Sequence, residues 1–224
     1  MKSKIKVIIT GATGMVGEGV LQECITNQKV EKILLINRKS SGYTHPKIEE
    51  IVQADLSDIS VVSEKIKGYD ACYFCLGVSS VGMKEEDYKK VTYDLTLGFA
   101  KTLALVNPGM TFCYVSGGGT DSSEKGKQMW ARIKGKTEND LMKLSLDAYN
   151  FRPAFMKPTA GAKNVKGFYK FINAIYPFLR LFSTTYFLTL EEVGKAMINA
   201  SLGGFSKRIL EVKDISQLSQ KQYS

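Results

Sequence analysis

Short, uninterrupted apolar runs alternate along the chain with longer segments of helical periodicity. The apolar runs predict buried strands over 6–10, 33–36, 50–54, 71–76, 110–115 and 149–151. Between these runs, apolar residues spaced three and four apart predict helices that end near 25 or extend over 61–66, 85–106 and 128–146. Strands that are apolar throughout are typical of a parallel sheet covered on both faces. The pattern therefore predicts an α/β fold, a doubly wound parallel sheet with helices on both faces.

The regular alternation stops after the sixth predicted strand. One well-marked helix follows, and Thr189 with Glu192 three residues later has the spacing of a capping box at its start. A chain of 224 residues suits one large domain, and no internal repeat divides it. We expect a single domain over 1–224, in which residues 154–224 contribute a small lobe on the substrate side.

A glycine-rich turn follows the first predicted strand and precedes the first predicted helix. Glycines in this position allow a tight bend, a close approach of the backbone to a pyrophosphate, and close packing of helix on strand. The amino end of the helix would direct free N–H groups at the phosphates. The turn lies at the sheet edge where strands end, which is where ligands bind in this architecture. Its predicted cofactor-binding residues are Gly11, Thr13, Gly14, Met15, Val16 and Gly17.

Composition and charge narrow the candidate partners. Lys and Arg number 31 against 22 Asp and Glu, which gives a formal net charge of +9. This balance favours anionic ligands, but the lysines are scattered and form no basic and aromatic cluster, so we expect no nucleic acid partner. No apolar run is long enough for a membrane-spanning helix, and the amino-terminal residues show no cleavage pattern of a signal peptide. We expect a cytoplasmic protein without an integral membrane segment.

The four cysteines and the single histidine do not form a metal-binding motif. Cys72 and Cys75 make a C-x-x-C, but residues three apart on a strand point to opposite faces of the sheet. A zinc site needs further ligands at suitable spacing, which His45 alone does not supply. We therefore expect no metal, and cysteines that are reduced and serve as small apolar side chains.

Together these features resemble the short-chain dehydrogenase/reductase superfamily, in its atypical, NAD-dependent epimerase/dehydratase-like branch. The turn has the spacing G-x-x-G-x-x-G, and the short chain with its Gly-Ala-Thr-Gly sequence is most similar to the small members around the Tat-interacting-protein oxidoreductases. The resemblance implies a Rossmann fold that binds NAD(P). It also implies further cofactor contacts near the adenine, the ribose and the nicotinamide, from Asp55 and Leu56, Leu76 and Gly77, and Arg152 and Pro153, respectively.

The end of the second predicted strand bears on which nicotinamide cofactor binds. An NAD site usually has an acidic residue there, in contact with the ribose 2′-hydroxyl. Here the chain reads Asn37-Arg38-Lys39-Ser40, without a carboxylate. The guanidinium of Arg38 suits bidentate contact with a 2′-phosphate, and Lys39 adds a second positive charge. The sequence thus predicts NADP(H) in preference to NAD(H), with solvated turn residues as the alternative interpretation.

The catalytic residues that the resemblance implies are incomplete. In the family, the tyrosine of a Y-x-x-x-K pair exchanges a proton with the substrate oxygen, the lysine lowers its pKa and holds the nicotinamide ribose, and a serine orients the substrate. Ser116, Trp130 and Lys134 stand at the matching positions, so a tryptophan replaces the tyrosine. An indole N–H donates a hydrogen bond but is not an acid or base near neutral pH. Lys134 itself, a bound water or a tyrosine from the C-terminal lobe are the candidate proton donors.

Two further segments have more than one interpretation. The glycine-rich stretch 116–123 is either a substrate-facing loop that orders on binding or an ordinary loop. The aromatic segment 168–182 is a lid or part of the core, the surface of a homodimer, or an amphipathic membrane contact. Pro177 interrupts the continuous helix that a membrane contact needs, so we favour the lid or core.

Two functions of different classes fit the sequence. The first is an NADP(H)-dependent oxidoreductase, or a related epimerase- or dehydratase-like enzyme, that acts on a small or apolar carbonyl substrate. The second is a sensor or scaffold that binds NADP(H) but is catalytically weak or inactive, as the replacement at Trp130 suggests. We expect the enzyme.

Overall fold

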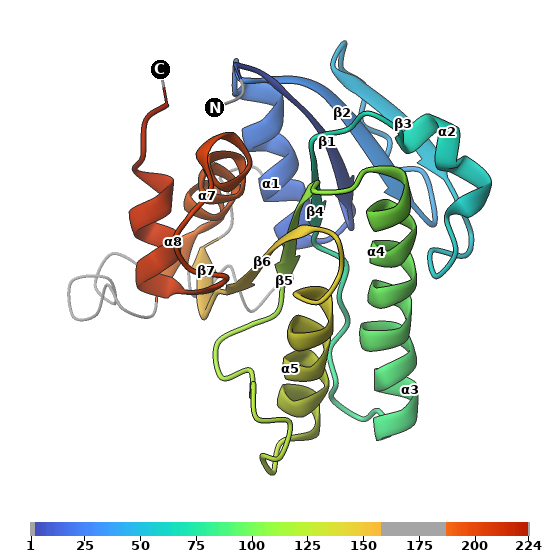
Figure 1. Ribbon diagram of the computed structural model, residues 1–224, viewed down its shortest axis with the longest axis vertical. Helices are drawn as coiled ribbons and strands as arrows, with labels where there is room; N and C mark the ends of the chain where they lie inside the picture. Colours follow the sequence, from blue (N-terminus) through green and yellow to red (C-terminus); the bar gives the residue numbers. More distant parts are fainter. Residues whose placement is uncertain (1–2, 158–186, 224) are drawn as a thin grey trace.

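The computed structural model describes residues 3–157 and 187–223, and parallel strands form its central sheet. These strands are β1 (Ile5–Thr10), β2 (Val30–Asn37), β3 (Ile48–Val52), β4 (Ala71–Phe74), β5 (Thr111–Val115), β6 (Asp147–Arg152) and β9 (Ile209–Glu211). They lie in the order β3-β2-β1-β4-β5-β6-β9 and every neighbouring pair is parallel (Figure 1). A separate two-stranded sheet pairs β7 (Phe155–Lys157) with β8 (Phe187–Thr189). The order confirms the predicted doubly wound Rossmann fold, which reverses direction between β1 and β4.

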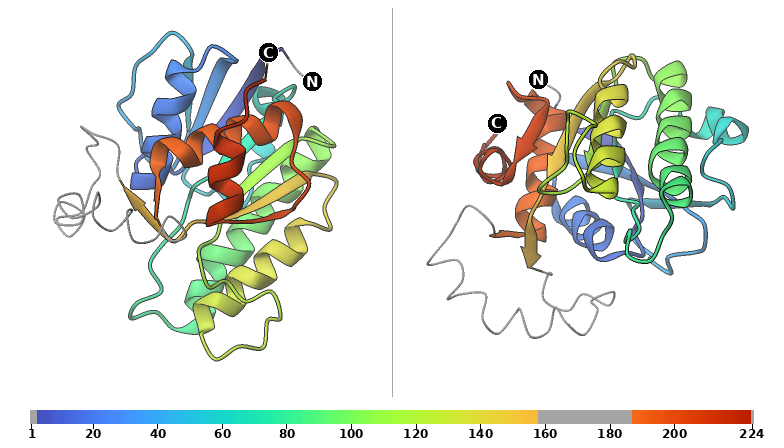
Figure 2. Two further views of the ribbon diagram at one scale, coloured as in Figure 1. Left: turned by 90° about the vertical axis from the view of Figure 1, so that its left-hand side faces the viewer. Right: turned by 90° about the horizontal axis from the view of Figure 1, so that it is seen from below.

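Helices cover both faces of the sheet (Figure 2). One face packs against α1 (Met15–Thr26), α7 (Leu190–Gly203) and α8 (Val212–Ser219). The other packs against α4 (Leu95–Val106), α5 (Met129–Leu141) and the one-turn α2 (Ser63–Ile66), which follows the 3₁₀ turn η1 (Ser60–Val62). Alternation within β1 explains the two cores, because Val7 and Ile9 belong to the first cluster while Ile8 belongs to the second. Both faces of a central strand are therefore buried.

The predicted helix over 85–106 forms, but not as a uniform α-helix. It consists of α3 (Glu85–Lys89), the π-helical turn η2 (Lys90–Asp94) and α4. A π-helical turn accommodates one more residue than an α-helical turn does. Tyr93 lies in this turn, and its hydroxyl donates to Asp140 Oδ2 of α5 at 2.7 Å. The insertion thus accompanies a contact between the two helices that cover the same face of the sheet.

The two halves of the C-x-x-C lie on opposite faces of the sheet. Cys72 belongs to the cluster beneath α4, whereas Cys75 packs against the cluster beneath α1. All four cysteines are free, and burial raises the pKa of the Cys75 thiol to about 12. Burial raises the pKa of the other three thiols as well, which disfavours the reactive thiolate form.

The chain after the sixth strand returns to the sheet. The predicted capping box forms, because Thr189 Oγ1 accepts from Glu192 N at 3.0 Å and the Glu192 carboxylate accepts from Thr189 N at 2.8 Å. Gly19 lets α7 approach α1 closely, since a Cβ on Gly19 would lie 2.6 Å from Leu190 Cβ. The sequence did not predict β9, which adds a strand beside β6. The aromatic segment 168–182 lies outside the described residues, and a substrate lobe over 154–224 stays a prediction.

Candidate functional site

The glycine turn between β1 and α1 is closely packed against its own backbone and against the end of β4. Gly11 has a φ of +72°, and a Cβ on it would lie 2.9 Å from the Cys75 carbonyl and the Leu76 nitrogen. A Cβ on Gly17 would lie 2.1 Å from the Gly11 carbonyl oxygen. Only glycine fits both positions without a shift of backbone. The turn therefore lies where the strand order reverses, at the carboxyl ends of β1 and β4.

This turn fits the diphosphate of a dinucleotide. Thr13 and Gly14 are exposed, and Gly14 begins α1 without a side chain that could cap its first N–H groups. Such N–H groups and the helix dipole form an anion-binding site. Within the described residues, the buried hydroxyl of Thr10 has no hydrogen-bond partner. The residues present would hold a pyrophosphate by backbone groups alone, and Met15 and Val16 lie in the first turn of the helix.

The end of β2 holds a carboxylate that the sequence analysis missed. Glu50 of β3 accepts from Asn37 Nδ2 at 3.0 Å, from Ser40 Oγ at 2.7 Å and from Ser41 N at 2.9 Å. Burial opposes ionisation, but the hydrogen bonds from Ser41, Ser40 and Asn37 outweigh it and hold the pKa of Glu50 below its usual value. The two carboxylate oxygens of Glu50 therefore accept hydrogen bonds from the loop after β2 and hold that loop in place. Pairing of Asn37 with Val52 in the parallel ladder brings Glu50 there, which no local motif signals.

Arg38 and Lys39 project from this fixed loop into solvent. Both side chains are exposed, directly after the end of β2. They lie at the same edge of the sheet as the glycine turn, because β1 and β2 are parallel neighbours. The structure therefore brings two exposed cationic side chains and the turn to the same edge, as an adenosine 2′-phosphate would require.

The other predicted cofactor contacts lie along this edge. Asp55 is exposed and accepts from the backbone N and the hydroxyl of Ser57, which lowers its pKa. Leu56 is buried, and Gly98 of α4 permits the close approach of the loop because a Cβ there would lie 2.2 Å from the Ser57 carbonyl oxygen. Leu76 and Gly77 follow β4 next to Gly11. Their contacts with a cofactor stay predictions.

Helix α5 presents Trp130, Lys134 and Glu138 on one face, because the three are spaced four residues apart. The Lys134 amine donates a hydrogen bond to the Ser116 carbonyl oxygen at the end of β5. Burial lowers the pKa of Lys134 to about 8, although the charge of Glu138 acts to raise it. Trp130 lies beside the glycine loop, since a Cβ on Gly119 would be 3.5 Å from its ring. Lys134 is thus an amine that can gain or lose a proton near neutral pH.

The Ser116 hydroxyl is engaged by groups of the protein itself. Ser116 is buried, and its Oγ donates to Glu138 Oε1 at 2.5 Å and lies 3.1 Å from the Phe151 carbonyl oxygen. A hydroxyl has one hydrogen to donate, and here Glu138 takes it. The role of orienting a substrate, which the family resemblance implies for Ser116, stays a prediction.

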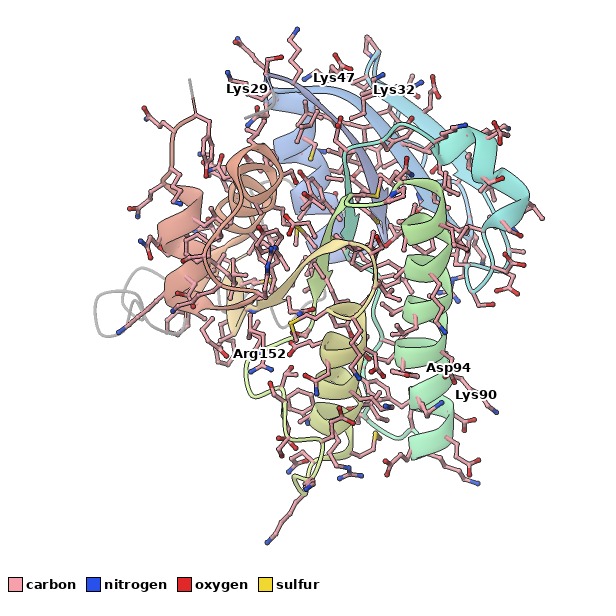
Figure 3. The ribbon with its side chains drawn as sticks, in the orientation of Figure 1. Lys29, Lys32, Lys47, Lys90, Asp94 and Arg152 are labelled. Atoms are coloured by element: carbon pink, nitrogen blue, oxygen red, sulfur yellow. The ribbon has the colours of Figure 1, made fainter. Side chains whose placement is uncertain are left out.

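Arg152 lies at the end of β6 (Figure 3), and carboxylates from two other elements hold its guanidinium. It pairs with buried Glu138 through Nε at 3.0 Å and Nη2 at 2.5 Å, and with Glu211 through Nη1 at 3.2 Å. Nη2 also donates to Ser122 Oγ at 2.6 Å. The family resemblance implies a place for Arg152 and Pro153 beside a nicotinamide, whereas Glu138 was not predicted from the sequence. The four-residue spacing from Lys134 was the available signal.

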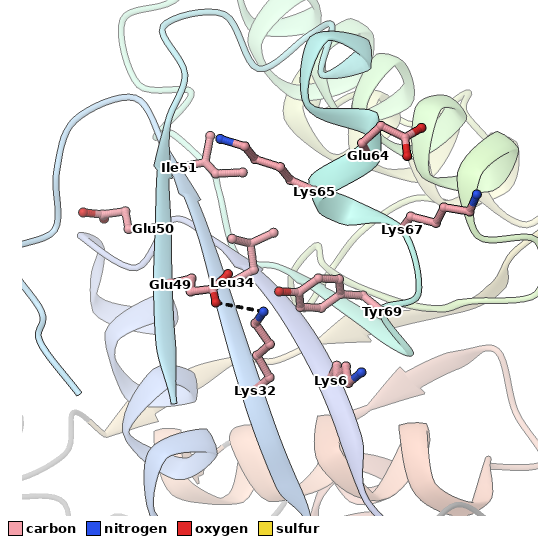
Figure 4. Close-up of a pocket in the computed structure, with 10 residues that line it drawn as sticks. All are labelled: Lys6, Lys32, Leu34, Glu49, Glu50, Ile51, Glu64, Lys65, Lys67 and Tyr69. Atoms are coloured by element: carbon pink, nitrogen blue, oxygen red, sulfur yellow. Dashed lines mark ion pairs between the residues drawn. The ribbon is translucent and has the colours of Figure 1, made fainter. Parts of the chain in front are cut away.

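Two hollows lie at opposite edges of the sheet. One, of about 840 Å³, is at the carboxyl edge and is lined by Gly118, Gly119, Arg152, Ala154, Lys207, Glu211, Val212, Lys213, Asp214 and Gln217. The other, of about 580 Å³, lies near the amino ends of β1 and β2 (Figure 4). There Lys32 pairs with Glu49 at 2.8 Å, among other lysines and glutamates. The carboxyl-edge hollow adjoins Arg152 and the glycine loop, so it is the candidate substrate pocket.

Neither a metal-binding cluster nor a membrane-spanning helix is found among the described residues. They contain no group of three or more His, Cys, Asp or Glu side chains that could hold a metal ion. Among the helices in the described ranges, none is both long and apolar enough to cross a membrane.

Comparisons with known proteins agree with this geometry. The family model of the NAD dependent epimerase/dehydratase family matches residues 7–117. Leucinostatins biosynthesis cluster protein T of Purpureocillium lilacinum is 28% identical over 85% of this chain and 82% of its own length. Protein HTATIP2 of Rattus norvegicus is 25% identical over 67% of this chain, and the mitochondrial protein FMP52 of Candida glabrata is 28% identical over 64%. The chain spans 62% and 60% of these last two relatives, respectively.

Solved structures support the same fold. The enzyme WbmF of Bordetella bronchiseptica, solved in complex with NAD⁺, matches with a TM-score of 0.68 and 13% sequence identity. The match covers 96% of this chain and 77% of WbmF. The glycine turn, the strand order and the matched family model agree. Over residues 7–117 the chain is similar to the NAD dependent epimerase/dehydratase family, and its fold is the doubly wound fold of these solved structures.

Proposed function

We propose that this protein is an NADP(H)-dependent oxidoreductase that acts on a small or apolar carbonyl compound. One observation carries the proposal. The turn after β1, in which only glycine fits at positions 11 and 17, lies where the strand order reverses, beside the end of β4. The match of residues 7–117 to the NAD dependent epimerase/dehydratase family supports a nicotinamide cofactor, which supplies the hydride when bound. The residues of this chain have to bind the cofactor, place the carbonyl and supply a proton.

The preference for the phosphorylated cofactor rests on Arg38 and Lys39. Both are exposed next to the turn, and the nearby carboxylate of Glu50 has its oxygens occupied by Asn37, Ser40 and Ser41. A bidentate guanidinium contact is a strong recognition element for phosphate. An unoccupied acid that would accept from a ribose 2′-hydroxyl is missing from this loop, as far as the described residues extend.

Lys134 takes over the proton transfer that a tyrosine would otherwise perform. Its amine is held at the end of β5 and has a pKa near 8, so that both protonation states are accessible near neutral pH. Trp130, one helical turn earlier, contributes an apolar wall. The adjoining hollow at the carboxyl edge holds the carbonyl compound, with apolar surface from Ala154 and Val212.

Oxidation of NADPH against a panel of carbonyl compounds tests the function, with Lys134→Ala as the key variant. Loss of positioned acid catalysis should lower the rate about a hundredfold to ten-thousandfold. In the unaltered protein the rate of reduction should fall as the pH rises through about 8, because Lys134 then loses the proton that it donates. Trp130→Tyr should raise activity by restoring a phenol. An active Lys134→Ala variant would contradict the assignment of the proton donor.

A sensor or scaffold that binds NADP(H) without turnover is the second candidate function. Trp130 and the engagement of the Ser116 hydroxyl by Glu138 favour it, because neither side chain then acts on a substrate. Cofactor binding with no turnover in either the unaltered protein or Trp130→Tyr would support this second function and end the first.

A cytoplasmic location belongs to the same proposal. The relative FMP52 is named as mitochondrial, and the matched segment covers 60% of that protein. Fractionation of cells that express the chain with a tag distinguishes the two locations. Recovery with mitochondria would overturn the cytoplasmic assignment.

A further inference from the structure

Glu138 is a fully buried carboxylate that the proposed reaction does not use. Its exposed fraction is 0%, and its oxygens accept two hydrogen bonds from Arg152 and one from Ser116. Removing a carboxylate from water is expensive unless a partner compensates for it. Arg152 provides this compensation in the planar, two-bond geometry that guanidinium favours.

Such a pair is not needed for packing alone. A buried ion pair often stabilises a protein no more than apolar side chains of similar volume would. This pair also lies at a junction, because Arg152 reaches Ser122 in the glycine loop and Glu211 before α8. Its position next to the site suggests that it serves the site.

The surroundings of Lys134 leave Glu138 as the acidic group that acts on its charge. The pKa of Lys134 is lowered mainly by burial, and Glu138, one helical turn away, acts in the opposite direction. From β5, Tyr114 faces the same region, and burial holds its pKa far above the usual value. Tyr88 of α3 lies beyond it and is likewise neutral. Arg152 of β6 pairs with Glu138 and also with Glu211, so it is the cation that faces this carboxylate.

We propose that Glu138 is a positioning residue for Lys134. Held by Arg152, it anchors Ser116, whose carbonyl oxygen accepts from the Lys134 amine, and its negative charge favours the protonated amine. The inference rests on the proposed function insofar as Lys134 acts there as the proton donor. It adds a second residue, whose charge partly offsets the effect of burial on the protonation of the first.

Competitive acetylation with acetic anhydride, read residue by residue by mass spectrometry over a range of pH, tests this inference. The neutral amine reacts, so the midpoint of the labelling curve reports the pKa, and the plateau at high pH reports access. In the unaltered chain the Lys134 midpoint should lie near pH 8. In Glu138→Gln the midpoint should move to lower pH, and labelling at neutral pH should rise about threefold to tenfold.

Three further variants distinguish the effect of the Glu138 charge from structural disruption caused by the substitution. Asp140→Asn removes a carboxylate from the same helix and should leave the Lys134 midpoint unchanged. Glu138→Asp keeps the charge and should restore a midpoint close to that of the unaltered chain. Glu138→Gln with Arg152→Gln leaves no unpaired buried charge, so it keeps the test available if the single variant fails to fold. Its Lys134 midpoint should also be lowered.

An unchanged Lys134 midpoint in the folded Glu138 variants would overturn the inference, as would a higher plateau without a change of midpoint. The labelling needs neither cofactor nor substrate. A moved midpoint in a protein that turns over nothing would leave the inference standing and end the proposed function. If the Lys134 midpoint does not move but the enzyme is active and depends on Lys134, the inference fails and the proposed function stands.

Discussion

The two halves of the candidate site are built in different ways. The half between β1, β2 and β4 is formed by backbone, with glycines at 11 and 17 that leave no room for a side chain. The half between β5, α5 and β6 is formed by buried side chains, in which Glu138 joins Ser116 and Arg152. In the proposed site the first half binds a ligand through backbone N–H groups, which nearly every residue has. Its shape therefore depends on the space that the glycines leave for the backbone. The second depends on charges that stabilise one another only when all of them are present.

The largest expected effect is on the stability of the second half. Arg152→Ala leaves the carboxylate of Glu138 buried without its cation, which should lower the free energy of unfolding by about 3–5 kcal/mol. Lys195→Ala is the matched control, because its pair with Glu191 is exposed. That variant should cost about 0.5 kcal/mol or less. Denaturant unfolding measures the free energy of unfolding of both variants. Equal losses of stability would show that the buried pair contributes no more than the exposed one.

The next effect is on the first half, through Gly17→Ala. Its Cβ would lie 2.1 Å from the Gly11 carbonyl oxygen, so the turn has to shift. Overpacking of this kind should cost about 1–3 kcal/mol of stability. A distorted turn should also weaken NADPH binding by about tenfold or more.

Gly14→Ala serves as the control in the same turn. Its Cβ would lie 3.4 Å from the same oxygen, and Gly14 has an extended backbone with a φ of −102°. Its stability should stay close to that of the unaltered chain. If Gly17→Ala unfolds at the same denaturant concentration as Gly14→Ala, the steric account of the turn is wrong.

The smallest expected effect on the fold itself comes from Arg38→Ala, which should change cofactor choice and leave stability nearly unchanged. Arg38→Ala removes the proposed contact with the 2′-phosphate and should weaken NADPH binding about tenfold to a hundredfold, since a hydrogen bond to a charged group contributes about 1.5–3 kcal/mol. NADH binding should change little. Fluorescence titration with both nucleotides measures the ratio, and an equal loss for both would assign Arg38 to the shared part of the cofactor.

The contrast between the halves also explains what the sequence analysis could predict. The turn over 10–17 is one contiguous segment with its own steric requirements, so its place in the fold was predictable. So were the doubly wound sheet and the helix that begins after Thr189, because hydrophobic period and capping are local signals. The contacts of each predicted site residue with cofactor and substrate stay predictions.

The second half escaped prediction because its contacts are long-range. Glu138 and Arg152 come from different elements, and Glu50 reaches the end of β2 only through strand register. The strand β9 was missed as well, because its three residues carry too short a pattern to identify. Residues 209–211 form a strand because they pair with β6, and not because of their own strand propensity.

Calorimetric titration of the unaltered chain with NADPH and with NADH tests the central claim most directly. A turn shaped for a diphosphate, next to two exposed cations, predicts heat from both nucleotides and tighter binding of NADPH. Tighter binding of NADH would contradict the role given to Arg38. The absence of heat and of thermal stabilisation with either nucleotide would contradict the site itself.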